Sequence, residues 1–420
     1  MKRVKGLFTL LLLTTIIVNT QGQNGINSPY TRFGLGQLSE QSVGVNKGMG
    51  GIGYGLSRRN TINLTNPASY STVDTLSFLF DFGFSLQNGN FEENGVKINA
   101  HNSSIDYLAM QFRLYKGLGM TMAFMPFSNV GYLFSTTQTI RDDQDGEVTA
   151  YNSHSGNGGL RQIKTGLGWK PFQHLSVGAN LSFLFGELSH QVINTFSESS
   201  IYSRKKTYGA DISTYKLDFG AQSTFSIGQD LLTVGLTYSP GHAIDDREYI
   251  YDVTYSSSET ISSDTALISN AFGLGDCLGT GFTYTHGSFT AGADISLDMW
   301  SRGLFFKEKG RDRIKIAVGG MYQPEADSKN LFRSSIYKAG FSYQGPYTYV
   351  NGNDGPREYC LSAGLTLPIT NRYNNLSRVN VSGQLIHIRP SSQGMITENY
   401  IRLNIGISFS ERWFMKWQVE

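Results

Sequence analysis

The chain has 420 residues, 16% of which are charged, and its formal net charge is +2. This near-neutral balance gives no reason to expect a nucleic-acid partner. Two cysteines, Cys277 and Cys360, are too few for a disulfide framework. Glycine (48), phenylalanine (26) and tyrosine (23) are abundant, proline (10) is scarce, and no shift in composition marks a linker between domains.

Residues 1–22 are predicted to be a secretory signal peptide. Three basic residues precede the apolar run Leu7–Val18, and small or polar residues follow up to position 22, which is the order of regions in such signals. Cleavage before Gln23 would lower the net charge from +2 to −1, because three cations and no acids are removed. The apolar run is too short for a membrane span, and no later segment approaches the ~18 consecutive apolar residues of a spanning helix.

The stretch Gly48–Tyr70 differs from everything around it. It is rich in glycine, which allows close approach of other groups, and its apolar side chains need a place to be buried. Pro67 fixes its own φ and restricts Asn66 to extended geometry, so a turn is expected there. We predict that residues 23–72 form an N-terminal segment and a hatch packed inside a wider structure, with an ordinary Gly-rich loop as the alternative. The residues expected to build the hatch are Gly48, Gly50, Gly51, Gly53, Gly55, Asn66, Pro67 and Ala68.

Long segments of alternating hydrophobicity fill the rest of the chain. In the last one, every second residue from Ile401 to Phe409 is apolar and the residues between them are polar or small, the period of a β-strand. Similar runs recur and extend over ten or more residues, which matches the ~9–11 residues of a tilted transmembrane strand better than the ~5–6 of a globular strand. Aromatic residues near the ends of the runs fit interfacial girdles. The pattern predicts an all-β transmembrane barrel.

Fourteen antiparallel strands are expected within a barrel domain at 73–410, an even number as in bacterial barrels. The connections alternate between short turns and longer polar segments, which we interpret as outer loops at 88–101, 141–157, 194–210, 251–267 and 348–356. Residues 411–420 are expected to form a periplasmic tail. The predicted strands are 74–87, 102–115, 118–140, 158–170, 174–193, 211–227, 231–250, 268–285, 289–302, 311–323, 334–347, 357–369, 377–390 and 397–410.

No enzyme, metal or cofactor site emerges from the sequence. The seven histidines share no metal-ligand spacing, and no group of residues meets the criteria for a catalytic site. The acidic run 142–147 lacks the full EF-hand spacing, so a solvated hairpin tip is expected there. Arg58 and Arg59 are expected either to pair with lumenal acids such as Asp218, since a buried charge needs a partner, or to be solvated.

The Gly-rich segment leading into Asn66-Pro67-Ala68, followed by a first strand and fourteen strands in all, resembles the FadL-type outer-membrane channels for fatty acids and other hydrophobic compounds. In that family the N-terminal segment plugs the barrel and carries an Asn-Pro-Ala signature. The opening segment Ser28–Gly36 is similar to that of a divergent branch. The resemblance covers the mature chain by architecture and carries over no ligand-contacting residue.

The resemblance implies a location in the cell outer membrane, with lipids around the barrel. It also implies a channel that takes up hydrophobic small molecules such as fatty acids through an apolar-lined pocket. The alternative is a non-transporting partner barrel, which binds other proteins in secretion or outer-membrane assembly. The two functions differ in the partner they require, a hydrophobic ligand for the channel and a protein for the partner barrel.

Overall fold

The computed structural model describes residues 25–412 apart from 76, 94, 142–146, 199, 245–246, 257–258, 269–271, 306–307, 326–327, 329, 370–376 and 393. The predicted signal peptide, the acidic run at 142–146 and all but the first two residues of the predicted tail lie outside the described residues. No helix within the described part of the chain is long and apolar enough to cross a membrane.

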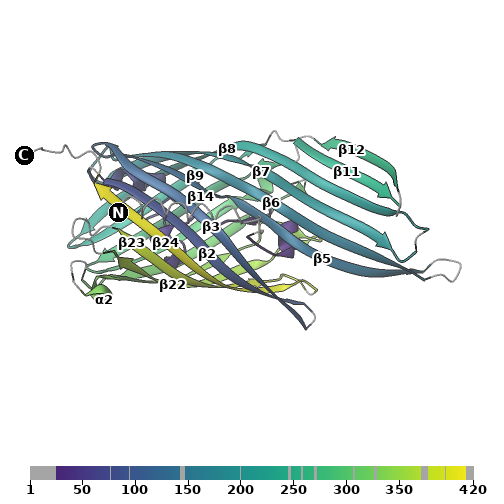
Figure 1. Cartoon of the computed structure of the whole chain (residues 1–420). Coiled ribbons are helices and arrows are strands. Elements are labelled where there is room, and N and C mark those ends of the chain that lie inside the picture. The colour runs from purple at the N-terminus through teal and green to yellow at the C-terminus, as the bar shows by residue number, and fades with distance from the viewer. Residues whose placement is uncertain are drawn as a thin grey trace, which may run out of the picture.

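Fourteen antiparallel strands form one closed barrel, as predicted (Figure 1). The last strand pairs with the first from Ser77 opposite Arg412 to Glu92 opposite Thr397, so the barrel has no open seam there and its backbone groups are satisfied within the wall. The strands are β2 (Ser77–Glu93), β3 (Val96–Tyr115), β4 (Leu118–Pro126), β6 (Glu147–Trp169), β7 (Leu175–Phe196), β8 (Ser203–Ile227), β9 (Asp230–Ser239), β14 (Asp276–His286), β15 (Phe289–Met299), β18 (Arg313–Tyr322), β19 (Ile336–Gln344), β22 (Arg357–Pro368), β23 (Arg378–Arg389) and β24 (Thr397–Arg412).

The outward faces of the strands define the lipid-facing belt. On β7 the outward residues from Leu175 to Phe185 are apolar, whereas their inward neighbours Asn180 and Ser182 are buried. Glu187 is the next outward residue after Phe185 and is exposed, which places the outer boundary of the belt near it. The belt thus covers about eleven residues of this strand, as a tilted transmembrane strand requires.

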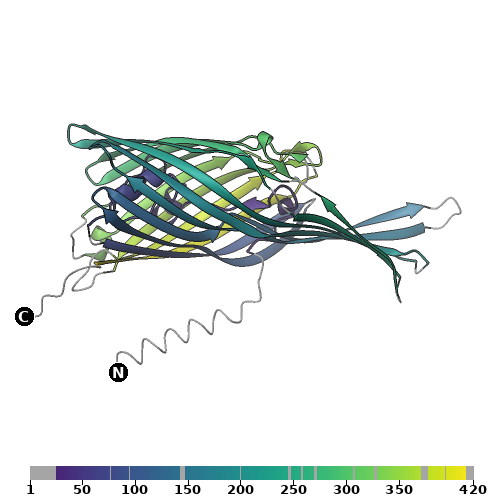
Figure 2. The ribbon, with the colours of Figure 1, turned by 90° about the horizontal axis from the view of Figure 1, so that it is seen from above.

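Several strands continue well beyond this belt, which corrects the sequence prediction (Figures 1 and 2). Most of the polar segments predicted as outer loops at 88–101, 141–157, 194–210 and 251–267 are strand. Together β5 (Ser128–Arg141), β6, β7, β8, β11 (Arg247–Tyr255) and β12 (Thr260–Ile268) form a six-stranded outer sheet. The prediction failed because these segments are rich in polar residues, which is also the composition of surface loops.

The wall is interrupted between β3 and β5. β3 pairs with β4 only from Leu108 to Tyr115, and β5 pairs with β6 and with the two-residue β1 (Gln37–Leu38). Residues 25–38, here called the strap, lie at this break. The Asn27 Nδ2 atom donates to Asn102 Oδ1 on β3 at 3.2 Å, and the Thr31 hydroxyl lies 3.1 Å from the Gly131 amide on β5. The strap therefore bridges the two strands that do not pair.

Small elements complete the fold. Short 3-10 helices lie in the N-terminal segment, η1 (Pro29–Arg32), η2 (Gly44–Met49) and η3 (Pro67–Thr72), and η4 (Trp300–Arg302) lies between strands. Residues 43–72, which include η2 and η3, are called the hatch below. The remaining elements are α2 (Leu331–Ser334), β10 (His242–Ala243), β13 (Gly273–Leu274), β16 (Leu304–Phe305), β17 (Glu308–Lys309), β20 (Tyr349–Val350) and β21 (Asn353–Asp354).

Candidate functional site

The hatch lies inside the barrel, and all eight residues predicted to build it are buried. Asn66 is the N-cap of η3, where its side-chain Oδ1 accepts a hydrogen bond from the Ala68 amide at 3.1 Å. Pro67 occupies the first helical position, where its missing N–H costs nothing. The Asn-Pro-Ala turn is thus a capped helix start within the lumen.

Asn66 also joins the hatch to the wall. Its Nδ2 donates to the Tyr54 carbonyl at 2.9 Å and to the Ala221 carbonyl on β8 at 3.2 Å. The side chain of Gln222, also on β8, donates to the same Tyr54 carbonyl at 2.8 Å. One asparagine therefore caps a helix and connects two parts of the hatch with the wall.

The hatch glycines present backbone amides to polar side chains of the wall. The Gly50 amide donates to Ser362 Oγ at 2.8 Å, and the Gly53 amide donates to Asp294 Oδ2 at 2.6 Å. At Gly50 the φ angle is +68°, and an added Cβ would lie 2.8 Å from the Phe341 carbonyl oxygen. Glycine is needed here both for its conformation and for the close approach to the wall.

Wall glycines provide the matching surface, a feature that sequence reasoning missed. An added Cβ at Gly178 would lie 2.5 Å from the Pro67 carbonyl, and one at Gly168 would lie 2.8 Å from the Tyr70 Cβ atom. Larger residues at these positions would push the hatch away. The overall excess of glycine was visible in the sequence, but which strand glycines face the hatch depends on the register. Other wall glycines in contact with the hatch are Gly220, Gly235, Gly319 and Gly340.

Apolar side chains seal the hatch against the wall. One cluster centres on the fully buried Tyr70 and joins Ile62 and Leu64 to β2, β3 and β4. A second joins Met49 and Ile52 to residues of β18 and β19. Met321 and Ile336, at the ends of those two strands that flank a loop, belong to the second cluster. The hatch thus closes the lumen toward the end with the short turns, which is the periplasmic end in such barrels.

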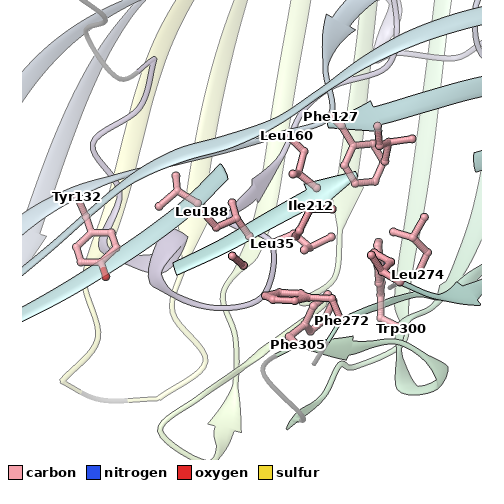
Figure 3. Close-up of a cluster of buried hydrophobic side chains, with 14 residues drawn as sticks. Leu35, Phe127, Tyr132, Leu160, Leu188, Ile212, Phe272, Leu274, Trp300 and Phe305 are labelled. Carbon is pink, nitrogen blue, oxygen red and sulfur yellow. The ribbon is translucent and has the colours of Figure 1, made fainter. Parts of the chain in front are cut away.

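A second apolar cluster, here called the outer seal, lies toward the outer end of the lumen, and Figure 3 shows its side chains. Leu35 of the strap is 1% exposed and packs in a cluster with Phe127, Phe272 and Trp300. The strap that carries Leu35 is held by hydrogen bonds from the Ser28 hydroxyl to Glu398 Oε1 at 2.6 Å and from the Tyr30 hydroxyl to the Ile396 carbonyl at 2.5 Å. Other members of this outer seal are Val130, Tyr132, Leu160, Leu184, Leu188, Ala210, Ile212, Ile244, Leu274 and Phe305.

Within the lumen lies a cavity of about 260 Å³ whose lining combines apolar surface with many polar and charged side chains. Six cationic and six carboxylate side chains line it, so their formal charges cancel. Buried pairs include Lys47 with Asp106 at 2.5 Å and Arg313 with Asp298 at 2.6 Å. These twelve charged side chains distinguish the cavity from the apolar-lined pocket expected for a hydrophobic-compound channel. The charged lining residues are Glu40, Lys47, Asp106, Lys164, Lys216, Asp218, Asp294, Asp298, Arg313, Lys315, Glu358 and Arg402.

The expected pairing of Arg58 with Asp218 is wrong. Asp218 pairs instead with Lys216 and, at 3.6 Å, with Lys164. Arg58 donates to Gln323 Oε1 at 2.6 Å, next to the end of β18. The side chain of Arg59 is 80% exposed and lies 3.9 Å from the carboxylate of Asp74, with which it forms a surface ion pair.

Glu40, just before the hatch, is a buried carboxyl whose charge is stabilised by cations of the cavity. Burial acts to raise the pKa of the Glu40 carboxyl. The ammonium groups of Lys47 and Lys315, together with hydrogen bonds from Ser42 and Gln384, outweigh this effect and lower the pKa. The carboxylate therefore remains ionised at neutral pH. No group of three or more potential metal-ligating side chains occurs among the described residues.

Comparison with solved structures supports the fold. The chain is similar to a FadL homologue of Pseudomonas aeruginosa (TM-score 0.61, 11% identity, 90% of this chain and 99% of that one). It is also similar to the monoaromatic hydrocarbon channel CymD (0.60, 14%, 90% and 100%) and to the toluene transporter TbuX of Ralstonia pickettii (0.60, 11%, 89% and 99%). These matches confirm the FadL-like barrel fold. The apolar outward belt of its strands agrees with the expected location in the outer membrane.

A search of curated proteins found no match. The family model described as BamG, in contrast, matches residues 3–420, almost the entire chain. The FadL resemblance expected from the sequence is thus confirmed at the level of the fold, in a divergent branch. The chain belongs to the BamG family.

Proposed function

We propose that this protein is a non-transporting partner barrel associated with the β-barrel assembly (BAM) complex of the outer membrane. The family name BamG supports this association. The observation that carries the proposal is the packing of the lumen by the hatch and by the outer seal around Leu35, each of which buries apolar side chains inside the barrel. Between the two seals lies a charge-balanced cavity, whereas ligand pockets for hydrophobic compounds are predominantly apolar.

The second candidate is the uptake of hydrophobic molecules. It is favoured by the likeness of the fold to hydrocarbon channels. A shared fold does not imply a shared function, which depends on the site. A channel of this kind would have to displace a hatch whose backbone is bonded to the wall, for example through Ser362 and Asp294.

Native purification distinguishes the two functions. We expect the tagged protein, extracted in mild detergent, to retain proteins of the assembly complex in stoichiometric amounts. We also expect a deletion strain to show normal uptake of fatty acids and a reduced level of other outer-membrane barrels. A purified barrel that carries a bound lipid and no protein, together with a loss of uptake on deletion, would contradict the proposal.

A further inference from the structure

One edge of the outer sheet is open. The strand β12 pairs with β11 on one side, and among the described residues no strand pairs with its other side. Most strands of the closed barrel are paired on both sides, whereas the outer half of β3 pairs with β2 alone at the break that the strap bridges. The free edge of β12 therefore presents a row of backbone N–H and C=O groups at strand spacing, which is a template for another strand.

The sequence of β12, TISSDTALI, contains few of the features that usually protect an edge, and Asp264 is its only charged residue. It has no Lys or Arg, whose charges commonly prevent strand addition, and no Pro or Gly, which interrupt an edge strand. Eight of its nine residues are exposed, so both faces of the strand are open to solvent, and Leu267 is 82% exposed. Threonine and isoleucine are also residues that favour strand pairing.

The opposite edge of the outer sheet, at β5, is covered at its start and pairs with β6 alone beyond it. The chain's own strap covers the start of that edge, where Gln37 pairs with Asn129 and Leu38 with Ser128. The Thr31 side chain adds a hydrogen bond at Gly131. β12 has no such intramolecular cover among the described residues.

The charges beside the open edge indicate what would pair with it. Asp264 lies directly opposite Asp252 on β11, and like charges in this position are destabilising. Arg204 on β8 binds Asp252 through two hydrogen bonds, so this arginine compensates Asp252. Among the described residues no cation forms an ion pair with Asp264, whose carboxylate accepts a hydrogen bond from the Thr265 amide. A cation on an added strand would therefore be favourable beside Asp264.

We propose that β12 is a docking edge for an extended strand of a surface-exposed protein of the assembly complex, and that this strand places Lys or Arg beside Asp264. The proposal rests on the proposed function and assigns it a contact surface. A polypeptide fits because only another backbone satisfies alternating donors and acceptors along a strand. Lipid chains offer neither, so they do not satisfy such an edge.

Proline substitutions test the backbone hydrogen bonds of the edge, because proline has no N–H to donate. Ser263 and Asp264 are consecutive, so the N–H of one points to β11 and that of the other to the free edge. We expect at least one of the single variants Ser263→Pro and Asp264→Pro to lower the assembly proteins retained by the tagged barrel at least tenfold. Ser263→Ala, which keeps the N–H, should leave retention within twofold of the native protein.

Two further variants sharpen the test. Asp264→Asn should lower retention by up to about fivefold, the range of a cross-strand charge pair. Thr137→Pro places the same substitution on β5, and retention should stay within twofold. Heat-modifiable migration in gels verifies that each barrel is folded.

The outcomes separate the two proposals. If the native protein retains no assembly proteins, the proposed function is wrong. If it retains them and neither proline at β12 lowers retention more than twofold, only the docking edge is refuted. The docking edge is also refuted if the β12 prolines abolish a dimer of the native protein and leave the retained proteins unchanged, because the edge then serves a second copy of this chain.

Discussion

Replacement of Asn66 by alanine should loosen the hatch while leaving the barrel intact. Asn66 is completely buried, and its side chain makes the cap to Ala68 and hydrogen bonds to the Tyr54 and Ala221 carbonyls. Loss of a cap costs about 1 kcal/mol, and each further hydrogen bond contributes about 1 kcal/mol. The free energy of opening the hatch should therefore fall by about 3 kcal/mol.

Hydrogen–deuterium exchange of the folded barrel measures this change locally. A loss of about 3 kcal/mol corresponds to a roughly hundredfold increase in the opening equilibrium, so amides of residues 43–72 should exchange about a hundredfold faster. Amides of the barrel strands serve as an internal reference and should not change. Thr65→Ala is the matched control, since Thr65 is half-buried beside Asn66 and no side-chain cap depends on it. Equal protection of the hatch in the native and Asn66→Ala proteins would refute the role of Asn66.

Three further predictions concern the lipid face, the seals and the buried charges. Leu181→Arg, on the lipid-facing belt, should reduce the free energy of folding into bilayers by about 2–4 kcal/mol, measured by urea titration. Deletion of 46–64 should leave single-channel conductance near zero, because the outer seal remains. Only the combination of this deletion with Leu35→Ser should open a steady pore, and a large conductance from the deletion alone would contradict this expectation. Arg313→Met should destabilise the protein by about 3–5 kcal/mol because Asp298 is left buried without its partner, and the additional change Asp298→Leu should restore most of the loss.

The barrel itself was predictable because lipid imposes a strong pattern on the sequence. Strands such as β7 and β24 must present apolar residues at every second position within the belt, so their number and approximate limits follow from the period. The outer sheet extends beyond the lipid-facing belt, so its outward residues carry no such constraint. β12, with TISSDTALI, therefore gave the same signal as a loop.

The interior of the barrel was less predictable because it depends on the register between strands. Lys164 on β6 lies opposite Ser182 on β7, which in turn lies opposite Lys216 on β8. Only this alignment brings both lysines to Asp218. A single sequence shows which residues face inward but not which of them meet. For the same reason the hatch residues could be named from the sequence, whereas the wall glycines that receive them could not.

The strength of the hatch–wall contacts bears on the choice between transport and a structural role. At least eight hydrogen bonds join the two parts within the described residues, including those from Gly44 to Tyr107, from Gly50 to Ser362 and from Thr283 to Gly55. At about 1 kcal/mol each, their loss would cost about 8 kcal/mol before any apolar contact is broken. A ligand shifts a conformational equilibrium only by its difference in affinity for the two states, and the entire binding free energy of a micromolar ligand is about 8 kcal/mol. The entire binding free energy of a small hydrophobic molecule would thus be needed to displace the hatch, and the outer seal would still lie in its path. Exposed strand edges outside the membrane bind a partner without such a rearrangement. Binding at the surface therefore requires less conformational free energy than transport through the lumen.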